Sequence, residues 1–327
     1  MRFASTWIFK PVLLAACVAT AFIANAVTPA PDAAHTPPVP LLWKVSDQDN
    51  SVYLLGSFHL LKPSDYPLSE DVDAALADAE SLVFELPPEE MSSPALGMQM
   101  AQAAMRSDGS LLNSELPAAT VALLDEWLAV NGADLLKMGL TPEVLQRFEP
   151  WFVGLMISIT EMTKQGLDPK FGLDAHIAAQ AAKAAKHSTG LETGAEQIAM
   201  LDGMGKQEQL QFLAEALSQS ADGKEETMRL HAAWRAGDVE QLWNGMALEM
   251  KQEYPDLYQR INVARNDAWV PRIAQRLDTA GTDDTLVVVG TLHLLGADGV
   301  VEKLRAKGYK VERVCSACAV SSRPANR

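Results

Sequence analysis

The chain has 327 residues, of which 48% are hydrophobic, so it is long enough to bury a large core. It carries 27 Lys and Arg residues against 42 Asp and Glu residues, which gives a net charge of −15 at pH 7. This charge argues against a nucleic-acid binder, because nucleic-acid binding depends on Lys and Arg that neutralise phosphates.

Residues 1–26 have the pattern of a secretory signal peptide. A positively charged start precedes an apolar run at 11–23, which is too short to span a bilayer, and Ala-Asn-Ala at 24–26 fits a cleavage site. The pattern predicts a periplasmic or secreted protein. The run Leu-Ala-Ala-Cys17 resembles a lipobox, so a lipid anchor at Cys17 is the alternative.

The rest of the chain divides into a linker, one domain and a tail. Residues 27–40 are rich in Pro and Ala and predict an extended linker. No later run approaches the roughly 18 apolar residues that a membrane span needs, so none is expected. We expect the domain at 41–314 and the tail at 315–327.

The first elements of the domain are β-rich. Runs at 41–46 and 51–59, separated by Asp-Gln-Asp-Asn, predict a hairpin. A helix is expected at 69–80, with Ser69 as its N-cap. The run 81–86 then has the pattern of a short buried strand that two prolines stop.

The middle of the chain, from 89 to 280, is mostly helical by pattern, since apolar residues recur three and four positions apart. One break at 187–193 predicts a strand. The chain then closes with a strand at 285–293, a helix at 297–308 and a strand at 309–314. We therefore expect an α/β fold, with a central mixed sheet built from both chain ends and a large, mostly helical insertion.

One phrase occurs twice, as YLLGSFHLL at 53–61 and as VVVGTLHLL at 287–295. By chance, 20 glycines and 6 histidines would give roughly 0.4 Gly-x-x-His motifs in such a chain. Each phrase predicts a buried strand that ends in a histidine, at the sheet edge where α/β proteins bind ligands. We expect His59 and His293 to lie side by side there. The alternative is that each histidine only satisfies backbone groups in a tight turn.

Glu85 is the candidate third member of this site. It lies in an apolar run, where an unpaired buried carboxylate would cost several kcal/mol, so a compensating partner is expected. The alternative is a solvent-facing residue on an edge strand. His59, Glu85 and His293 together have the two-His, one-carboxylate composition that suits Mn, Co, Fe or Zn. The chain has no His-Glu-x-x-His motif, so a standard zinc protease is excluded.

Three further polar residues are candidates for the same site. Glu192 follows the predicted strand at 187–193 closely enough to reach the sheet edge, or else it is an acid favoured at a helix N-terminus. Arg265 and Asn266 lie in a predicted long helix, where Arg265 could also form a surface ion pair. His176 has the pattern of a surface or helix-end histidine.

Cys315 and Cys318 form a Cys-x-x-Cys pair near the C-terminus. Such a pair can be redox-active, half of a zinc site or a structural disulfide. Zinc needs two more ligands, which the tail does not offer. Redox pairs sit where a helix begins, whereas this pair follows a strand-like run and precedes a polar tail. A structural disulfide is therefore the favoured prediction.

Five blocks, in order, resemble the TraB/PrgY/GumN family, to which the Tiki-type metalloproteases are related. They are GSFHLL at 56–61, VFELP at 83–87, the run 172–197, ARNDAW at 264–269 and the run 287–314. The family signature is two Gly-x-x-His motifs and a Glu after the second core strand, which here are His59, His293 and Glu85. The resemblance implies an erythromycin-esterase/Tiki-like fold and a divalent metal held by these three residues, with Mn or Co favoured and Zn an alternative.

The resemblance also implies a function. It is that of a secreted or periplasmic metal-dependent hydrolase, a peptidase, acting on a peptide or protein. Glu192 or His176 would serve as general base and Arg265 would stabilise the oxyanion, while Asn266 would lie around the substrate. The alternative is a non-catalytic peptide-binding or regulatory protein of the pheromone-shutdown type, which would use the same cleft.

Overall fold

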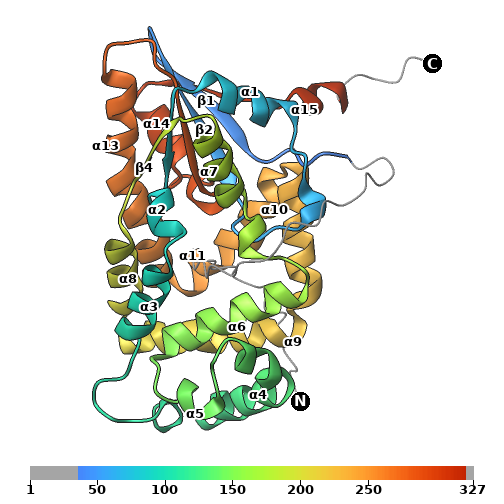
Figure 1. Ribbon diagram of the computed structural model, residues 1–327, viewed down its shortest axis with the longest axis vertical. Helices are drawn as coiled ribbons and strands as arrows, with labels where there is room; N and C mark the ends of the chain where they lie inside the picture. Colours follow the sequence, from blue (N-terminus) through green and yellow to red (C-terminus); the bar gives the residue numbers. More distant parts are fainter. Residues whose placement is uncertain (1–35, 322–327) are drawn as a thin grey trace, which may run out of the picture.

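A six-stranded mixed sheet lies toward one end of the molecule (Figure 1). Its strand order is β4-β3-β5-β2-β1-β6. The computed structural model describes residues 36–321. The strands are β1 (Leu42–Ser46), β2 (Ser51–Ser57), β3 (Ser81–Phe84), β4 (His187–Gly190), β5 (Thr285–Gly290) and β6 (Lys310–Arg313). Strands β2, β5, β3 and β4 are parallel to one another, while β1 is antiparallel to both β2 and β6. The predicted α/β fold with a sheet from both chain ends is confirmed. The predicted signal peptide, Cys17 and the first part of the linker lie outside the described residues.

Strands β2 and β5 bring the repeated phrases together. They pair in parallel, with Gly56 opposite Val289 and Ser57 opposite Gly290. Every residue of both strands is buried, as expected for parallel strands covered on both faces. The expectation that the two phrases share one sheet is confirmed.

The strands end sooner than the sequence pattern predicts. Strand β2 stops at Ser57 and β5 at Gly290, so His59 lies in a turn and His293 in the 3₁₀ turn η6 (Thr291–Leu294). The apolar pattern continues past both strand ends because these turns are themselves buried. Ser69 also departs from prediction, since it precedes α1 (Glu70–Asp78) but makes no side-chain cap hydrogen bond.

Helices cover the sheet and form the insertion. The helices that precede or follow a strand along the chain include α1, α2 (Pro88–Met91), α7 (Leu173–Lys183), α8 (Gly194–Asp202), α13 (Ala264–Asp278) and α14 (Val300–Ala306). The others are α3 (Pro94–Ala103), α4 (Ala118–Lys137), α5 (Pro142–Leu145), α6 (Pro150–Lys164), α9 (Lys206–Ala236), α10 (Val239–Trp243), α11 (Glu249–Glu253) and α12 (Pro255–Tyr258), with short 3₁₀ turns η1 (Pro63–Asp65), η2 (Leu112–Ser114) and η3 (Pro169–Phe171). Helices α6 and α9 pack together across the end of the molecule opposite the sheet (Figure 1). Within residues 36–321, none of the helices combines the length and apolar character that crossing a bilayer requires.

Two predicted helices contain π-helical turns. The run 239–250 divides into α10, the π-turn η4 (Asn244–Leu248) and the start of α11. The run 254–277 divides into α12, the π-turn η5 (Gln259–Val263) and α13. A π-turn inserts one extra residue, which re-aims the side chains that follow it.

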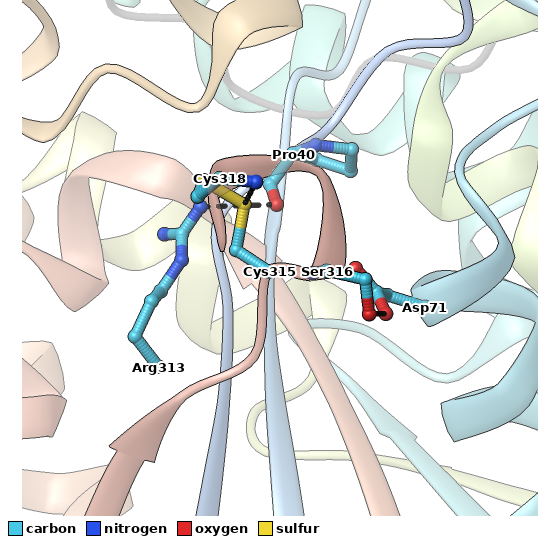
Figure 2. The surroundings of a disulfide bond; sticks show 6 residues. All are labelled: Pro40, Asp71, Arg313, Cys315, Ser316 and Cys318. Atoms are coloured by element: carbon cyan, nitrogen blue, oxygen red, sulfur yellow. Dashed lines mark hydrogen bonds between the residues drawn. A yellow bond between two sulfur atoms is a disulfide. The ribbon is translucent and has the colours of Figure 1, made fainter. Parts of the chain in front are cut away.

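The C-terminal cysteines form a disulfide, with their Cα atoms 5.3 Å apart. Figure 2 shows that the bond lies beside Ser316, whose backbone and hydroxyl both donate to Asp71, at 2.7 and 2.6 Å. The predicted Cys315–Cys318 disulfide is confirmed. The short helix α15 (Ser316–Ser321) begins between the two cysteines, so the pair does lie where a helix begins, contrary to the expectation from the sequence.

Candidate functional site

Three parallel strands deliver the central residues of the site. Strands β2, β5 and β3 are neighbours, so their carboxyl ends meet at one edge of the sheet. His59, His293 and Glu85 each follow one of these ends by one to three residues. Nε2 of His59 lies 3.8 Å from Oε1 of Glu85, and Nε2 of His293 lies 3.9 Å from the same oxygen. The structure therefore brings the three sequence-predicted ligands together.

Glu85 is a buried carboxylate with two strong partners. Its Oε1 accepts from the Gly290 backbone N–H at 2.6 Å, and its Oε2 accepts from Arg265 at 2.6 Å. Burial alone would raise the pKa of Glu85, but Arg265, the two histidines and the Gly290 N–H outweigh burial and hold this pKa well below its usual range. Strand β3 lies between β4 and β5, so the solvent-facing edge alternative for Glu85 is wrong.

Arg265, in the first turn of α13, is the cation at the centre of the cluster. Its NH2 donates to Glu85 and to Oε1 of Glu192, both at 2.6 Å, and its Nε donates to Oε2 of Glu192 at 3.1 Å. Its NH1 lies 2.9 Å from Nε2 of His293 and donates weakly to the Ile261 carbonyl at 3.3 Å. Burial would lower the pKa of Arg265, but the two carboxylates reverse the effect and raise it. The guanidinium therefore stays charged at every accessible pH.

Glu192 reaches the cluster because the β3–β4 ladder continues past the last residue of β4. The backbone N–H of Glu192 donates to the Glu85 carbonyl at 2.9 Å. Besides Arg265, the Glu192 carboxylate accepts from Gln197 at 3.2 Å. Burial raises the pKa of Glu192, against the opposing charge of Arg265.

Asn266 and Asp174 fix which ring nitrogen of each histidine carries a proton. Asn266 donates from Nδ2 to the Asp298 carbonyl at 2.8 Å, so its Oδ1 faces Nδ1 of His293, 2.7 Å away, as an acceptor. Oδ1 of Asp174 likewise lies 2.8 Å from Nδ1 of His59. Both histidines therefore donate through Nδ1–H, which turns their Nε2 atoms toward Glu85.

His293 is held neutral. Burial, reinforced by the nearby Arg265 charge, lowers the pKa of His293 to about 3, although Glu85 acts in the opposite direction. A neutral ring presents an unshared electron pair on Nε2, and Arg265 donates to it. This pairing makes His293 an acceptor for the arginine.

Asp174 was not singled out from the sequence. It lies in the first turn of α7 and also accepts a hydrogen bond from the Ser57 hydroxyl. The sequence offered one signal for Asp174: it lies in the run 172–197, one of the blocks that resemble the family, two residues before His176. Residues two apart on a helix point to different faces. His176 accordingly stacks on Tyr66, with ring centroids 4.1 Å apart, while Asp174 contacts His59.

The three predicted ligands do not fit a metal ion as they are arranged. Among the described residues, no group of three or more His, Cys, Asp or Glu side chains has the geometry of a metal site. Two ligands on tetrahedral bonds of about 2.1 Å lie about 3.4 Å apart, which is less than the 3.8 and 3.9 Å between each Nε2 and Oε1 of Glu85. In addition, Arg265 already occupies the electron pair of His293 and one oxygen of Glu85.

The cluster lies between an inner cavity and an outer groove. The inner cavity has a volume of about 70 Å³ and contacts His59, Glu85, Arg265 and His293. The rest of its wall is mainly apolar and includes Phe58, Met162, Met200, Leu201, Met246 and Ile261. The outer groove has a volume of about 860 Å³ and runs past Glu192 and Trp269. Arg265 and Met200 line both spaces, so they form the partition between them.

One of three comparisons with known proteins gave a match. The model of the TraB/PrgY/gumN family matches residues 41–313. A search of curated proteins found no match, and a search of solved structures found none. The family match spans most of the chain, including both Gly-x-x-His motifs and every residue of the cluster. The chain belongs to the TraB/PrgY/gumN family.

Proposed function

We propose that this protein is a hydrolase that cleaves peptide bonds with the cluster of His59, Glu85, Arg265 and His293. One observation carries the proposal: an imidazole Nε2 and a buried guanidinium converge on the same carboxylate, at the wall of a cavity. Buried titratable groups with opposed charges in a cleft are typical of catalytic sites.

The proposed reaction begins with a water molecule bound to Nε2 of His59. His59 takes the water proton, and Asp174 stabilises the imidazolium through its contact with Nδ1–H. The water oxygen attacks the peptide carbonyl, and the carbonyl oxygen becomes an oxyanion. When the C–N bond breaks, His59 returns the proton to the leaving amine, which leaves a carboxylic acid and an amine as products.

Arg265 stabilises the oxyanion in this proposal. All five of its N–H groups have acceptors in the resting site, and the weakest bond is the 3.3 Å contact with the Ile261 carbonyl. An oxyanion would replace that carbonyl at the lowest cost, and it would gain a charge-assisted hydrogen bond. Glu192 then acts as a positioning residue, since it grips the arginine with both oxygens. Asn266 is also a positioning residue, since its Oδ1 accepts from Nδ1–H of His293.

The test is cleavage of a peptide library by residues 27–327, followed by mass spectrometry. Wild-type protein should release defined fragments, and His59→Gln should abolish turnover because it removes the proton acceptor. His187→Ala, a substitution at an exposed histidine on β4, is the matched control and should keep full turnover. Cleavage by the His59→Gln variant at the wild-type rate would show that the assigned base is wrong.

A metal-dependent reaction is the second candidate, as the family resemblance implies. The observation in its favour is that acceptors hold both histidines through Nδ1–H and turn both Nε2 atoms inward, as in histidines that bind metals. Elemental analysis after loading with Mn, Co or Zn tests it. About one equivalent of metal in the wild type and none in a His59→Ala/His293→Ala double variant would support it.

The binding alternative predicts a different experimental result. If the chain is a non-catalytic peptide binder, wild-type protein should retain library peptides without cleaving them, and Glu85→Gln should change their affinity only modestly. We also propose that the protein is periplasmic or secreted, as the sequence of residues 1–26 predicts. There it would meet peptides outside the cytoplasm, whether it cleaves them or only binds them.

A further inference from the structure

Apart from the cluster, the wall of the inner cavity is mainly apolar, and Ser57, Gln197 and Thr291 are its other polar residues. Three methionines from three different helical segments line it: Met162 on α6, Met200 on α8 and Met246 on η4. A water-filled cavity needs several polar partners for each water molecule. The apolar walls therefore suit a hydrocarbon group better than water.

Both π-turns of the molecule's described part contribute to this wall. Met246 lies in η4 and Ile261 lies in η5, and both side chains line the inner cavity. Single π-turns in helices frequently mark functional sites. Two of them, on separate helices, direct side chains into one cavity of an otherwise closely packed core.

The volume of the cavity limits what it can hold. An apolar cavity of about 150 Å³ is large enough for benzene, and one water needs about 10–15 Å³. A cavity of about 70 Å³ therefore has room for a water at its polar end and a group of a few carbons. An aromatic ring would not fit.

The outer groove suits the remainder of a peptide. Charged residues of both signs line it, among them Glu196, Lys206, Glu208 and Arg272. Polar groups of this kind can pair with the amides of an extended chain. Since Arg265 and Met200 line both the groove and the inner cavity, the two spaces adjoin at the cluster, and a side chain that reaches the cavity from the groove would lie beside it.

We infer that the inner cavity is a specificity subsite, which takes a small aliphatic side chain, of the size of Ala or Val, from the residue next to the scissile bond. This inference rests on the proposed hydrolase, with the substrate peptide lying in the outer groove. The apolar walls reject charged side chains, which would lose their hydration there. The volume rejects aromatic ones.

Positional scanning of a cleaved peptide tests the subsite. At the position that enters the cavity, wild-type protein should prefer Ala or Val over Phe by about 10-fold or more in kcat/KM. Met246→Ala enlarges the cavity and should reduce or reverse that preference, also by about 10-fold. Met98→Ala, at a methionine that is 69% exposed on α3, is the matched control and should keep the wild-type preference. Cleavage without any preference, or the same profile in both methionine variants, would overturn the inference.

A second measurement does not depend on catalysis. The ¹³C-methyl NMR signals of the methionines can be followed while N-acetyl-valine amide is added, with N-acetyl-phenylalanine amide as comparison. The signals of Met162, Met200 and Met246 should shift with the valine compound only, and that of Met98 should stay in place. Absence of shifts would overturn the subsite even if the protein is a hydrolase. Shifts without any cleavage of peptides would instead count against the proposed hydrolase.

Discussion

Asp174 and Asn266 each hold one histidine of the cluster by the same atom, Nδ1, yet they differ in charge. A carboxylate stabilises a protonated ring and a neutral amide does not. His59 is therefore the histidine suited to carrying a proton in transit. His293, next to Arg265, is suited to remaining neutral.

The first prediction concerns the partner of His59. Asp174→Ala removes the acceptor of Nδ1–H, so kcat should fall about 100-fold or more. Asp174→Asn keeps an oxygen acceptor and should retain part of that activity. Asp125→Asn, at an exposed position on α4, controls for loss of charge alone. Unchanged turnover in the Asp174→Ala variant, with a native circular dichroism spectrum, would remove Asp174 from the mechanism.

The second prediction concerns pH. The folded-state pKa of His293 is about 3, whereas an unfolded histidine titrates near 6.5. Between these values the unfolded chain binds the extra proton, so the free energy of unfolding falls as pH drops below about 6.5. The loss approaches about 1.4 kcal/mol per pH unit from this one group. Urea unfolding of wild type and of His293→Gln between pH 7 and 5 should show a steeper decline in the wild type. Parallel declines would contradict the buried, neutral state of His293.

At the scale of elements, the N-terminus of α7 supports the turn that carries His59. Gly172, directly before α7, approaches this turn so closely that a Cβ there would lie 2.1 Å from the His59 carbonyl oxygen. The Leu173 N–H also donates to the Phe58 carbonyl at 3.2 Å. Helix α7 thus positions His59 twice, through its backbone and through Asp174.

The third prediction follows from this contact. Gly172→Ala must displace the His59 turn, so it should destabilise the fold and reduce turnover by 10-fold or more. Gly97→Ala is the matched control, because a Cβ at Gly97 in α3 meets nothing within 4 Å. That change should be neutral or should stabilise by up to about 1 kcal/mol. Thermal melts measure the stability of both variants, and kcat measures their turnover. A Gly172→Ala variant with wild-type turnover would show that the turn tolerates movement.

The sequence predicted the strands, the β1–β2 hairpin and the shared sheet of the two repeated phrases, because hydrophobic periodicity and the Gly-x-x-His repeat depend on local pattern. It placed His59 and His293 at strand ends, whereas both lie in the buried turns that follow. It did not predict the π-turns η4 and η5, since each adds only one residue to a run that otherwise has apolar residues three and four apart. It also did not predict the contacts of Asp174 with His59 or of Glu192 with Arg265. Those pairs are set by packing between α7, α13 and the sheet, which no local pattern records.

At the scale of the whole molecule, the sheet depends on a strand from near the end of the chain. Strand β5 lies between β2 and β3 and pairs with both. Without β5, strands β2 and β3 have no hydrogen-bonded contact with each other, and each loses its neighbour on one side. The helical insertion alone cannot restore that ladder.

The fourth prediction tests this dependence by truncation. A chain that ends at residue 280 lacks β5 and β6 and should not unfold cooperatively in urea, because its central sheet cannot close. A chain that ends at residue 314 keeps all six strands and should unfold as the full chain does. A cooperative transition in the shorter chain would show that the insertion folds without the sheet.

The position of β5 also has a consequence during synthesis. A ribosome must add every residue of the helical insertion before it makes Thr285–Gly290, and His293 follows three residues later. A nascent or prematurely terminated product therefore lacks both strand β5 and one of the two histidines of the cluster. In the proposed hydrolase, such a product would have no complete cluster, so it should not cleave peptides before His293 has been added and β5 has paired.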